Sequence, residues 1–207
     1  MSFERGSAVV HADHRAAPTS INLPLVDERT ASSEVKLLFA QYLERFSRDE
    51  LPGIVLAFAT NPVLLEAMLK IAEGLLFSET HLSRRHKEML ATYISRRNIC
   101  AYCADSHGSF LLALGGSPEM LCALQTGELD SELFSAAERA LLEFAENVNA
   151  NSPSVTRADV EAAIEAGWSE DHLSEAVHLA ALFAAFNRIA NGFGIPSPFP
   201  NRIVGSL

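Results

Sequence analysis

Apolar residues recur at helical spacing along most of the chain. From Ser33, apolar side chains spaced i, i+3, i+4 and i+7 predict a helix that Pro52-Gly53 closes. Pro62 begins a second helix, and its broad apolar face through Leu76 indicates deep burial. No segment shows the sustained alternation of a strand or the strand-glycine-helix order of a phosphate-binding loop.

Capping residues and helix breakers divide the rest of the chain in the same way. Ser83 caps a helix through Arg97, Cys100–Leu114 ends at Gly115-Gly116, Pro118–Leu124 is stopped by Gly127, and Ser135, Thr156 and Ser169 each cap a further helix. We therefore predict the all-α fold class, with about seven or eight helices.

The first residues lack this periodicity. Residues 1–30 mix prolines, hydroxyl side chains and charges, which favours an extended N-terminal arm that packs on other parts of the molecule, and residues 31–207 are expected to form a single helical domain. No apolar stretch suits a signal peptide, and the run Ala176–Ala185 is shorter than the roughly 20 residues of a membrane helix. We expect no contact with a membrane.

Composition and charge narrow the function classes. The chain has 207 residues, of which 48% are hydrophobic, enough for a globular core. Its formal net charge is −10 and no basic patch is visible, so nucleic acid is not an expected partner. Three cysteines are too few for a disulfide scaffold, which favours a reducing compartment and a cytoplasmic location.

Two thiols and an imidazole are predicted to share one helix face. At about 100° per residue, Cys103 lies roughly 60° from Cys100, and His107 projects between them. A helix start near Asn98, the imidazole and the second thiol each favour a thiolate. The two cysteines are placed to form a reversible disulfide across one helical turn.

Glu88 belongs to this group only if the chain bends. On an unbroken helix it would lie roughly 120° from Cys100. A bend at Arg97-Asn98 that packs the preceding helix over the next would bring a partly buried carboxylate to the thiols or to His107, where it could act as a general base. The alternative is that Glu88 faces solvent or pairs with a neighbouring arginine, Arg84 or Arg85.

At these residues the sequence resembles the AhpD-like alkylhydroperoxidases of the carboxymuconolactone decarboxylase type. The match is a glutamate twelve residues before C-x-x-C, followed by x-x-x-H: Glu88, Cys100, Cys103 and His107. The resemblance implies an AhpD-like helical bundle and a peroxidase in which Cys103 attacks the hydroperoxide, Cys100 closes the disulfide, and Glu88 and His107 relay protons. The helix dipole by itself favours Cys100 as the attacking thiol.

The sequence departs from the family pattern between the cysteines. Tyr102 stands where some members carry a second histidine, so no relay through that imidazole is available. The C-x-Y-C form, the N-terminal arm and the FNRIANGFGIP ending are similar to a peroxidase-related branch, which leaves the electron donor open. A dithiol partner of lipoyl or thioredoxin type is expected, together with a homo-oligomer: a dimer, trimer or hexamer.

Other interpretations of the same residues stay open. Cys100, Cys103 and His107 could hold Zn²⁺ with His81, His86 or water as fourth ligand, although no such ligand is evident in the motif; both cysteines could also be buried and idle. We expect no metal and no bound cofactor. Cys122 and His178 are expected to be buried, and Phe183 and Phe186 to lie in the core or an oligomer interface. Asn187 and Arg188 are expected to have a capping or ion-pair role, and the alternative that His178, Asn187 and Arg188 line the pocket stays open.

The predicted function is thiol-dependent reduction of an organic hydroperoxide or of a small disulfide. A lactone decarboxylase is a second enzyme hypothesis, which the cysteine pair disfavours because such relatives do not depend on one. A third hypothesis is a non-enzymatic module in which the disulfide switches a helix interface and changes the oligomer.

Overall fold

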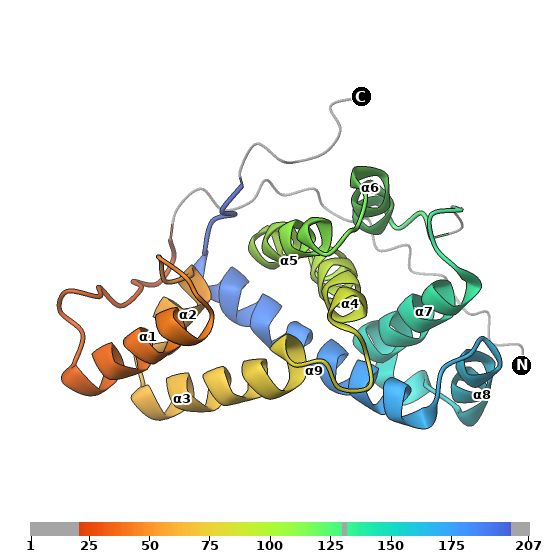
Figure 1. The fold of residues 1–207 in the computed structure, drawn as a ribbon, viewed down its shortest axis with the longest axis horizontal. Helices are drawn as coiled ribbons and strands as arrows, with labels where there is room; N and C mark the ends of the chain where they lie inside the picture. Colours follow the sequence, from red (N-terminus) through yellow and green to blue (C-terminus); the bar gives the residue numbers. More distant parts are fainter. Residues whose placement is uncertain (1–20, 130–131, 200–207) are drawn as a thin grey trace, which may run out of the picture.

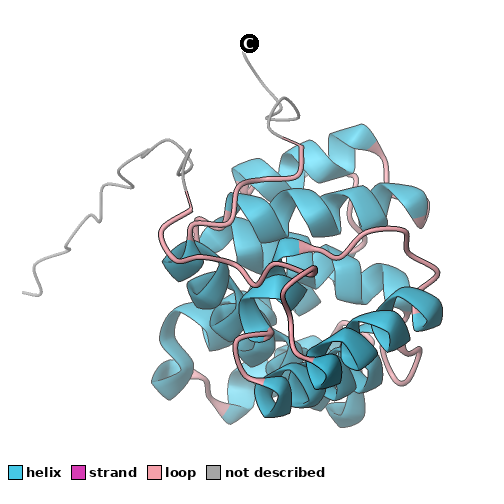
Figure 2. Cartoon of the chain, turned by 90° about the vertical axis from the view of Figure 1, so that its left-hand side faces the viewer, coloured by secondary structure: helices cyan, strands magenta, loops and turns pink. Residues whose placement is uncertain are grey.

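The computed structural model describes residues 21–129 and 132–199, and every regular element in these ranges is helical (Figure 2). The predicted all-α fold class is therefore confirmed. In chain order the elements are α1 (Ser33–Arg45), α2 (Gly53–Phe58), α3 (Pro62–Ile71) with the π-helical turn η1 (Ala72–Phe77), α4 (Arg84–Arg97), α5 (Ala101–Ala113), α6 (Pro118–Thr126), α7 (Ala136–Asn151), the 3-10 turn η2 (Ser152–Ser154), α8 (Arg157–Glu165) and α9 (Glu170–Phe193).

Helix α4 lies at the centre of the bundle and contacts α5, α6, α7, α9 and η1 (Figure 1). All residues from Lys87 to Ser95 are buried, so this helix has no solvent face along most of its length. Even the Lys87 ammonium is inside, where Nζ donates to the carbonyl oxygens of Leu75 and Ser78, both at 2.8 Å, and pairs with Glu175. A buried charge is tolerated only with such complete pairing.

The apolar residues form one large cluster and two smaller ones. The largest joins α4 to α7 and α9, and the second joins α1, α2 and α3. The third holds both cysteines of the motif and Tyr102, packed against Ala57, Ala190 and Ile195. The motif therefore lies where α5 meets α2 and α9.

Most of the predicted helix starts and stops are confirmed. The side chains of Ser83, Ser135 and Ser169 each accept a hydrogen bond from the first turn of the helix that follows. Gly127 and Gly194 adopt the left-handed conformation and end α6 and α9. Short polar side chains and glycine thus mark the boundaries, as their capping chemistry requires.

The interpretation of Pro52-Gly53 as a helix stop was wrong. Helix α1 already ends at Arg45, and Pro52 is the N-cap of the short helix α2, which the apolar pattern did not predict. Proline has φ near −65° and lacks an amide hydrogen, so it suits a helix start as well as a stop. The last turn of the second predicted helix is also different, because Ala72–Phe77 forms the π-helical turn η1.

The described part of the N-terminal segment lies against the C-terminal end of α9. The amide hydrogens of Asn22 and Leu23 bond to the carbonyl oxygen of Phe193, and that of Val26 bonds to Leu56. Residues 1–20, to which most of the predicted arm belongs, lie outside the described residues, and the division of the chain at residue 30 stays a prediction. Among the described helices, none has both the length and the apolar content to cross a membrane.

Candidate active site

A tight turn between α4 and α5 places the cysteine motif. Asn98 ends α4, Ile99 adopts a left-handed conformation with φ 55°, and the Cys100 amide hydrogen bonds to the Ser95 carbonyl at 2.9 Å. Cys100 is the N-cap of α5, which begins at Ala101. The predicted bend at Arg97-Asn98 is confirmed: Asn98 closes α4, and the N-cap of α5, Cys100, follows two residues later.

The left-handed backbone conformation of Ile99 is unfavourable for a residue with a side chain. We therefore predict that Ile99→Gly stabilises the protein. A left-handed residue with a side chain costs about 1–2 kcal/mol, and a glycine loses about 0.5–1 kcal/mol more chain entropy on folding. Because the Ile99 side chain is 61% exposed, little packing is lost, and the free energy of unfolding should rise by about 0.5–1 kcal/mol in a urea titration. Leu37→Gly, at an exposed position inside α1, should lower it; equal losses in both variants would contradict this account.

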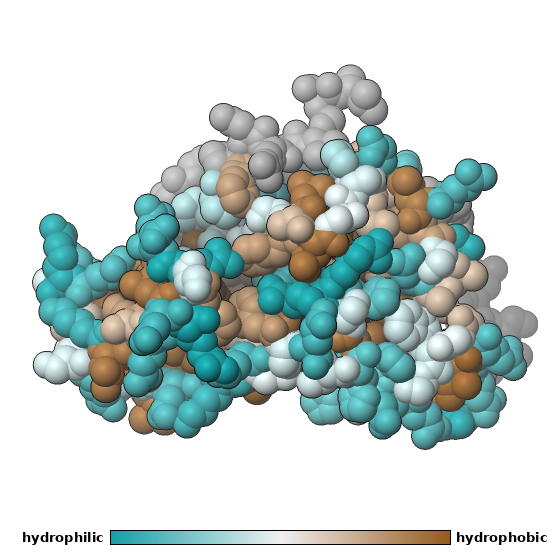
Figure 3. All heavy atoms as spheres, in the orientation of Figure 1, coloured by the Kyte–Doolittle hydropathy of each residue, from teal (hydrophilic) through white to brown (hydrophobic). Residues whose placement is uncertain are grey.

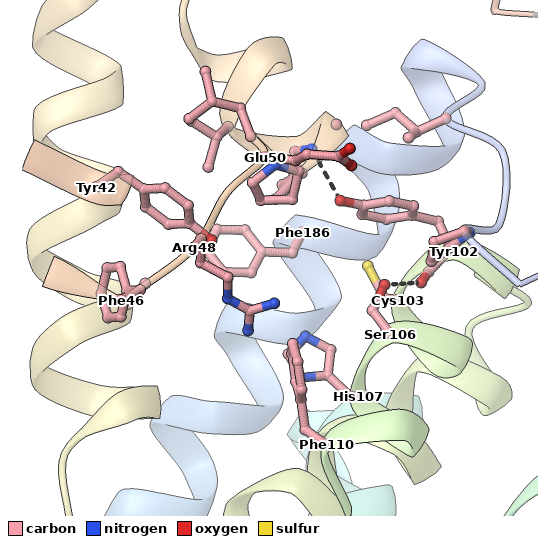
Figure 4. A pocket seen from close by; sticks show the side chains of 18 of the residues that line it. Tyr42, Phe46, Arg48, Glu50, Tyr102, Cys103, Ser106, His107, Phe110 and Phe186 are labelled. Atoms are coloured by element: carbon pink, nitrogen blue, oxygen red, sulfur yellow. Dashed lines mark hydrogen bonds between the residues drawn. The ribbon is translucent and has the colours of Figure 1, made fainter. Parts of the chain in front are cut away.

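The two cysteines of the motif are free thiols, and they differ in access. Both are buried, Cys100 at 1% exposure and Cys103 at 3%. Cys103 lines a large cavity, whereas Cys100 is not part of its wall. Figure 4 shows Cys103 on α5 with its sulfur beside this cavity. A molecule in the cavity therefore meets Cys103 first.

A hydrogen bond between the two thiols shifts their pKa values in opposite directions. Because Cys103 donates this bond, the pKa of Cys100 is lowered, despite the opposing effect of burial. The same bond, together with burial, raises the pKa of Cys103 well above its usual value. The two pKa directions favour a thiolate on Cys100 and a protonated thiol on Cys103, which lines the cavity.

We predict that Cys103→Ala raises the pKa of Cys100. The substitution removes the donor that contributes most to the lowered value and leaves the burial that opposes ionisation. Thiolate absorbance near 240 nm, followed against pH in a Cys122→Ser background, should show the ionisation of Cys100 at higher pH in this variant. An unchanged or lower pKa would show that the thiol pair is not the source of the shift.

Glu88 joins α4 to the histidine of the motif. Its carboxylate is fully buried, and Oε2 lies 2.6 Å from His107 Nδ1. The other oxygen, Oε1, accepts a hydrogen bond from Arg84 Nε at 2.7 Å. Both interpretations of Glu88 are thus present at once, since it pairs with Arg84 one turn earlier and also reaches the motif.

His107 is held between this carboxylate and two aromatic rings. The centroid of Phe183 lies 4.8 Å from that of the imidazole and the centroid of Phe110 lies 5.6 Å away, both edge-on. Because Nδ1 contacts Glu88, Nε2 is the ring nitrogen left for another partner. The imidazole lines the same cavity as Cys103, one helical turn further along α5.

The cavity has a volume of about 670 Å³, within the range of small-molecule sites. It lies between α1, α2, α3 and α5, and most of its wall is apolar. The Tyr102 hydroxyl, also in this wall, accepts a hydrogen bond from the Ile54 amide at 3.1 Å, and burial raises the pKa of the phenol. Tyr102 therefore contributes a fixed, neutral part of the cavity wall. The apolar side chains that shape the cavity include Tyr42, Phe46, Met68, Leu76, Phe110 and Phe186.

Asn187 has a place in the site that its sequence position did not reveal. Its side chain, 1% exposed, donates to Ser95 Oγ at 2.9 Å and accepts from Asn98 Nδ2 at 2.9 Å. It also hydrogen-bonds to the cysteine sulfurs, an interaction that lowers the pKa of both thiols. An asparagine within an apolar helix predicts a buried polar contact, but nothing in the sequence names the sulfurs as its partners.

The remaining candidates have structural positions. His178 was predicted to be buried, but it is exposed on α9 and bonds to the Ser174 carbonyl; Cys122 is only half-buried rather than in the core. Arg188 bonds to the Ala184 carbonyl, and Phe183 is fully buried as predicted. Within residues 21–129 and 132–199, no group of three or more histidine, cysteine and acidic side chains has the arrangement to hold a metal ion, so the zinc hypothesis gains no support from His81 or His86.

Known proteins share this fold. An uncharacterised peroxidase-related protein from Ralstonia eutropha JMP134 with an alkylhydroperoxidase AhpD core superposes with a TM-score of 0.76 and 23% identity, over 86% of this chain and 92% of its own. Another peroxidase-related protein, from Silicibacter sp. TM1040, gives a TM-score of 0.73 at 25% identity over 88% and 93%. A debrominase in complex with 2,3,4-tribromopyrrole gives 0.64 at 20% identity, over 84% and 89%.

The fold is therefore that of the alkylhydroperoxidase AhpD core. The predicted resemblance is also confirmed in sequence, because residues 62–147, less than half of the chain, match the carboxymuconolactone decarboxylase family. This segment contains Glu88, Cys100, Cys103 and His107. Sestrin-1 of Mus musculus is 24% identical over 182 residues, which are 87% of this chain; the chain spans about a third of that curated relative, 34% of its length.

Proposed function

We propose that the protein is a thiol-dependent peroxidase that reduces an organic hydroperoxide with Cys103 and Cys100. The observation that carries the proposal is the position of Cys103, whose sulfur lines a largely apolar cavity while it is hydrogen-bonded to a second thiol behind it. An idle pair of core cysteines would need neither the cavity nor the Glu88–His107 pair beside it. The AhpD fold and the family match support an enzyme of this general type.

The first step uses the shared proton of the thiol pair. Transfer of this proton from Cys103 to the Cys100 thiolate leaves the negative charge on the sulfur that faces the cavity. This thiolate attacks the outer oxygen of the hydroperoxide, an S–O bond forms, and the O–O bond breaks. The sulfur loses two electrons and becomes a sulfenic acid, while the substrate leaves as an alkoxide that takes up a proton.

His107 is proposed to supply the proton for the alkoxide. Its Nδ1 is held by the buried Glu88 carboxylate at 2.6 Å, which fixes the ring and orients Nε2 for transfer. The ring then recovers its proton from solvent. Glu88 thus acts through His107 and also remains the partner of Arg84.

The second step closes the disulfide. The Cys100 thiol condenses with the sulfenic acid of Cys103, an S–S bond forms, and one water is released. An external dithiol of lipoyl or thioredoxin type then reduces this disulfide and is itself oxidised. The balance is one hydroperoxide and one dithiol consumed for one alcohol, one water and one oxidised donor, and no bound cofactor is needed.

A coupled assay tests the function. Pure protein with dithiothreitol should consume cumene hydroperoxide and release cumyl alcohol, with one dithiol oxidised per hydroperoxide. No consumption above the rate without protein would contradict the proposal. If the oligomer, measured by size-exclusion chromatography, changes on oxidation without turnover, the redox-responsive module replaces it.

A further inference from the structure

An arginine from the first interhelical loop reaches the cavity. Ser47, just after α1, adopts a left-handed conformation with φ 48°, and the Arg48 amide hydrogen bonds to the Leu43 carbonyl at 2.9 Å. This pair of features is a helix-terminating motif in which glycine is usual. The fixed backbone directs the next side chain, Arg48, over the cavity instead of away from the helix end.

The Arg48 guanidinium lies in the wall of the cavity without an acidic partner. Its carbon atom lies 4.7 Å above the centre of the Phe110 ring, a cation–π contact that holds the group in place. Figure 4 shows it on the same side of the cavity as His107, while the Glu50 carboxylate points elsewhere. Within the described ranges, no carboxylate lies at ion-pair distance from Arg48, in contrast to Arg45, which pairs with Glu73.

The charge of the site makes this arginine distinctive. The chain carries a formal net charge of −10, and the carboxylate that contacts His107, that of Glu88, is already shared between the imidazole and Arg84. In the orientation of Figure 1, the surface shows hydrophobic residues gathered in the middle of the face and bordered by hydrophilic ones (Figure 3). The cavity therefore combines a largely apolar wall with the guanidinium of Arg48 near His107 and, near Tyr102, the carboxylate of Glu50.

We propose that Arg48 binds the carboxylate of an amphipathic substrate, so that the protein acts on hydroperoxides that carry a carboxylate on an apolar chain. The planar guanidinium can donate two parallel hydrogen bonds to a carboxylate, and the aromatic and aliphatic wall accommodates the chain. This substrate class rests on the proposed peroxidase function, because only that function requires the O–O group at Cys103.

Comparing a charged and a neutral form of one substrate distinguishes carboxylate binding by Arg48 from peroxide reduction at Cys103. The probes are the 13-hydroperoxide of linoleic acid and its methyl ester. Each is reduced with dithiothreitol as electron donor by the natural chain, by Arg48→Gln and by the control variant Arg157→Gln. Arg157 is a suitable control because it is exposed on α8 and paired with Glu161 and Glu170. A hydrogen bond to a charged group is worth about 1.5–3 kcal/mol, or about 10- to 100-fold. We expect kcat/KM for the acid to fall by this factor in Arg48→Gln, while the ester and the control variant change little.

Equal losses for acid and ester in Arg48→Gln, or no loss for either, would overturn the proposal. Linoleate has no O–O bond, so its binding can be measured by calorimetry without turnover. The affinity for linoleate should fall in Arg48→Gln and remain unchanged in Arg157→Gln. If cumene hydroperoxide is reduced but the affinity for linoleate is the same with and without Arg48, the carboxylate site is contradicted and the proposed peroxidase function is retained. If no hydroperoxide is reduced, the peroxidase fails, and linoleate binding that depends on Arg48 would still support the carboxylate site.

Discussion

Cys103→Ser is expected to lower hydroperoxide turnover at least about a thousand-fold, because it removes the thiol that lines the cavity. Serine fills nearly the same space, but its hydroxyl does not form a reactive anion near neutral pH and has no accessible sulfenic state. The rate of cumyl alcohol formation with dithiothreitol measures the loss.

Two further cysteine variants complete this test. Cys122→Ser, on α6 and outside the cavity wall, should retain the rate of the natural chain. In the absence of dithiothreitol, whose thiols can themselves reduce a sulfenic acid, Cys100→Ser should react once with hydroperoxide. It should then stop as a sulfenic acid on Cys103, because no second protein thiol closes the disulfide. Near-normal turnover in Cys103→Ser would remove the mechanism, and loss only in Cys100→Ser would assign the attack to the more acidic thiol.

The second large effect is expected at Glu88. Glu88→Gln keeps the shape of the side chain but removes the negative charge that holds His107 Nδ1 and orients the ring. We expect kcat to fall by about 10²- to 10⁴-fold, the usual contribution of a general acid or base. The free energy of unfolding should also fall, because a buried charge partner of Arg84 is lost.

A charge-neutralising control distinguishes these two effects. Glu143→Gln, at an exposed position of α7, should change neither kcat nor stability measurably. If Glu88→Gln lowers the melting temperature while kcat stays unchanged, Glu88 has a purely structural role. Glu88→Ala is a weaker test, since breaking a buried pair costs about 3–5 kcal/mol, much of the stability of an ordinary domain.

The helical fold could be predicted because its signals are local. Ser83, Ser135 and Ser169 cap their helices through contacts within one turn, which a sequence pattern records directly. The helix stop at Pro52-Gly53 was wrongly predicted because a local pattern is ambiguous there. Both residues suit a helix stop and a helix start, and only tertiary packing decides between them.

The site could be predicted only in part. The spacing of Cys103 and His107 on one helix is local, whereas the contact of Glu88 with His107 depends on α4 packing against α5, and the sequence offered this as one of two alternatives. Asn187 and Arg48 approach from α9 and from the loop after α1, far away in the sequence, and neither belongs to a motif. Long-range packing brings Asn187 to the cysteines and Arg48 to the cavity wall, so no spacing rule could have found them.

A single turnover without external reductant tests the central claim most directly. Reduced protein is mixed with an equimolar amount of cumene hydroperoxide, free thiols are trapped with N-ethylmaleimide, and peptides are identified by mass spectrometry. The account predicts a disulfide between Cys100 and Cys103 and one cumyl alcohol released per disulfide. Cys122 should remain a free thiol and be alkylated by N-ethylmaleimide. Full alkylation of Cys100 and Cys103 beside intact hydroperoxide would contradict it.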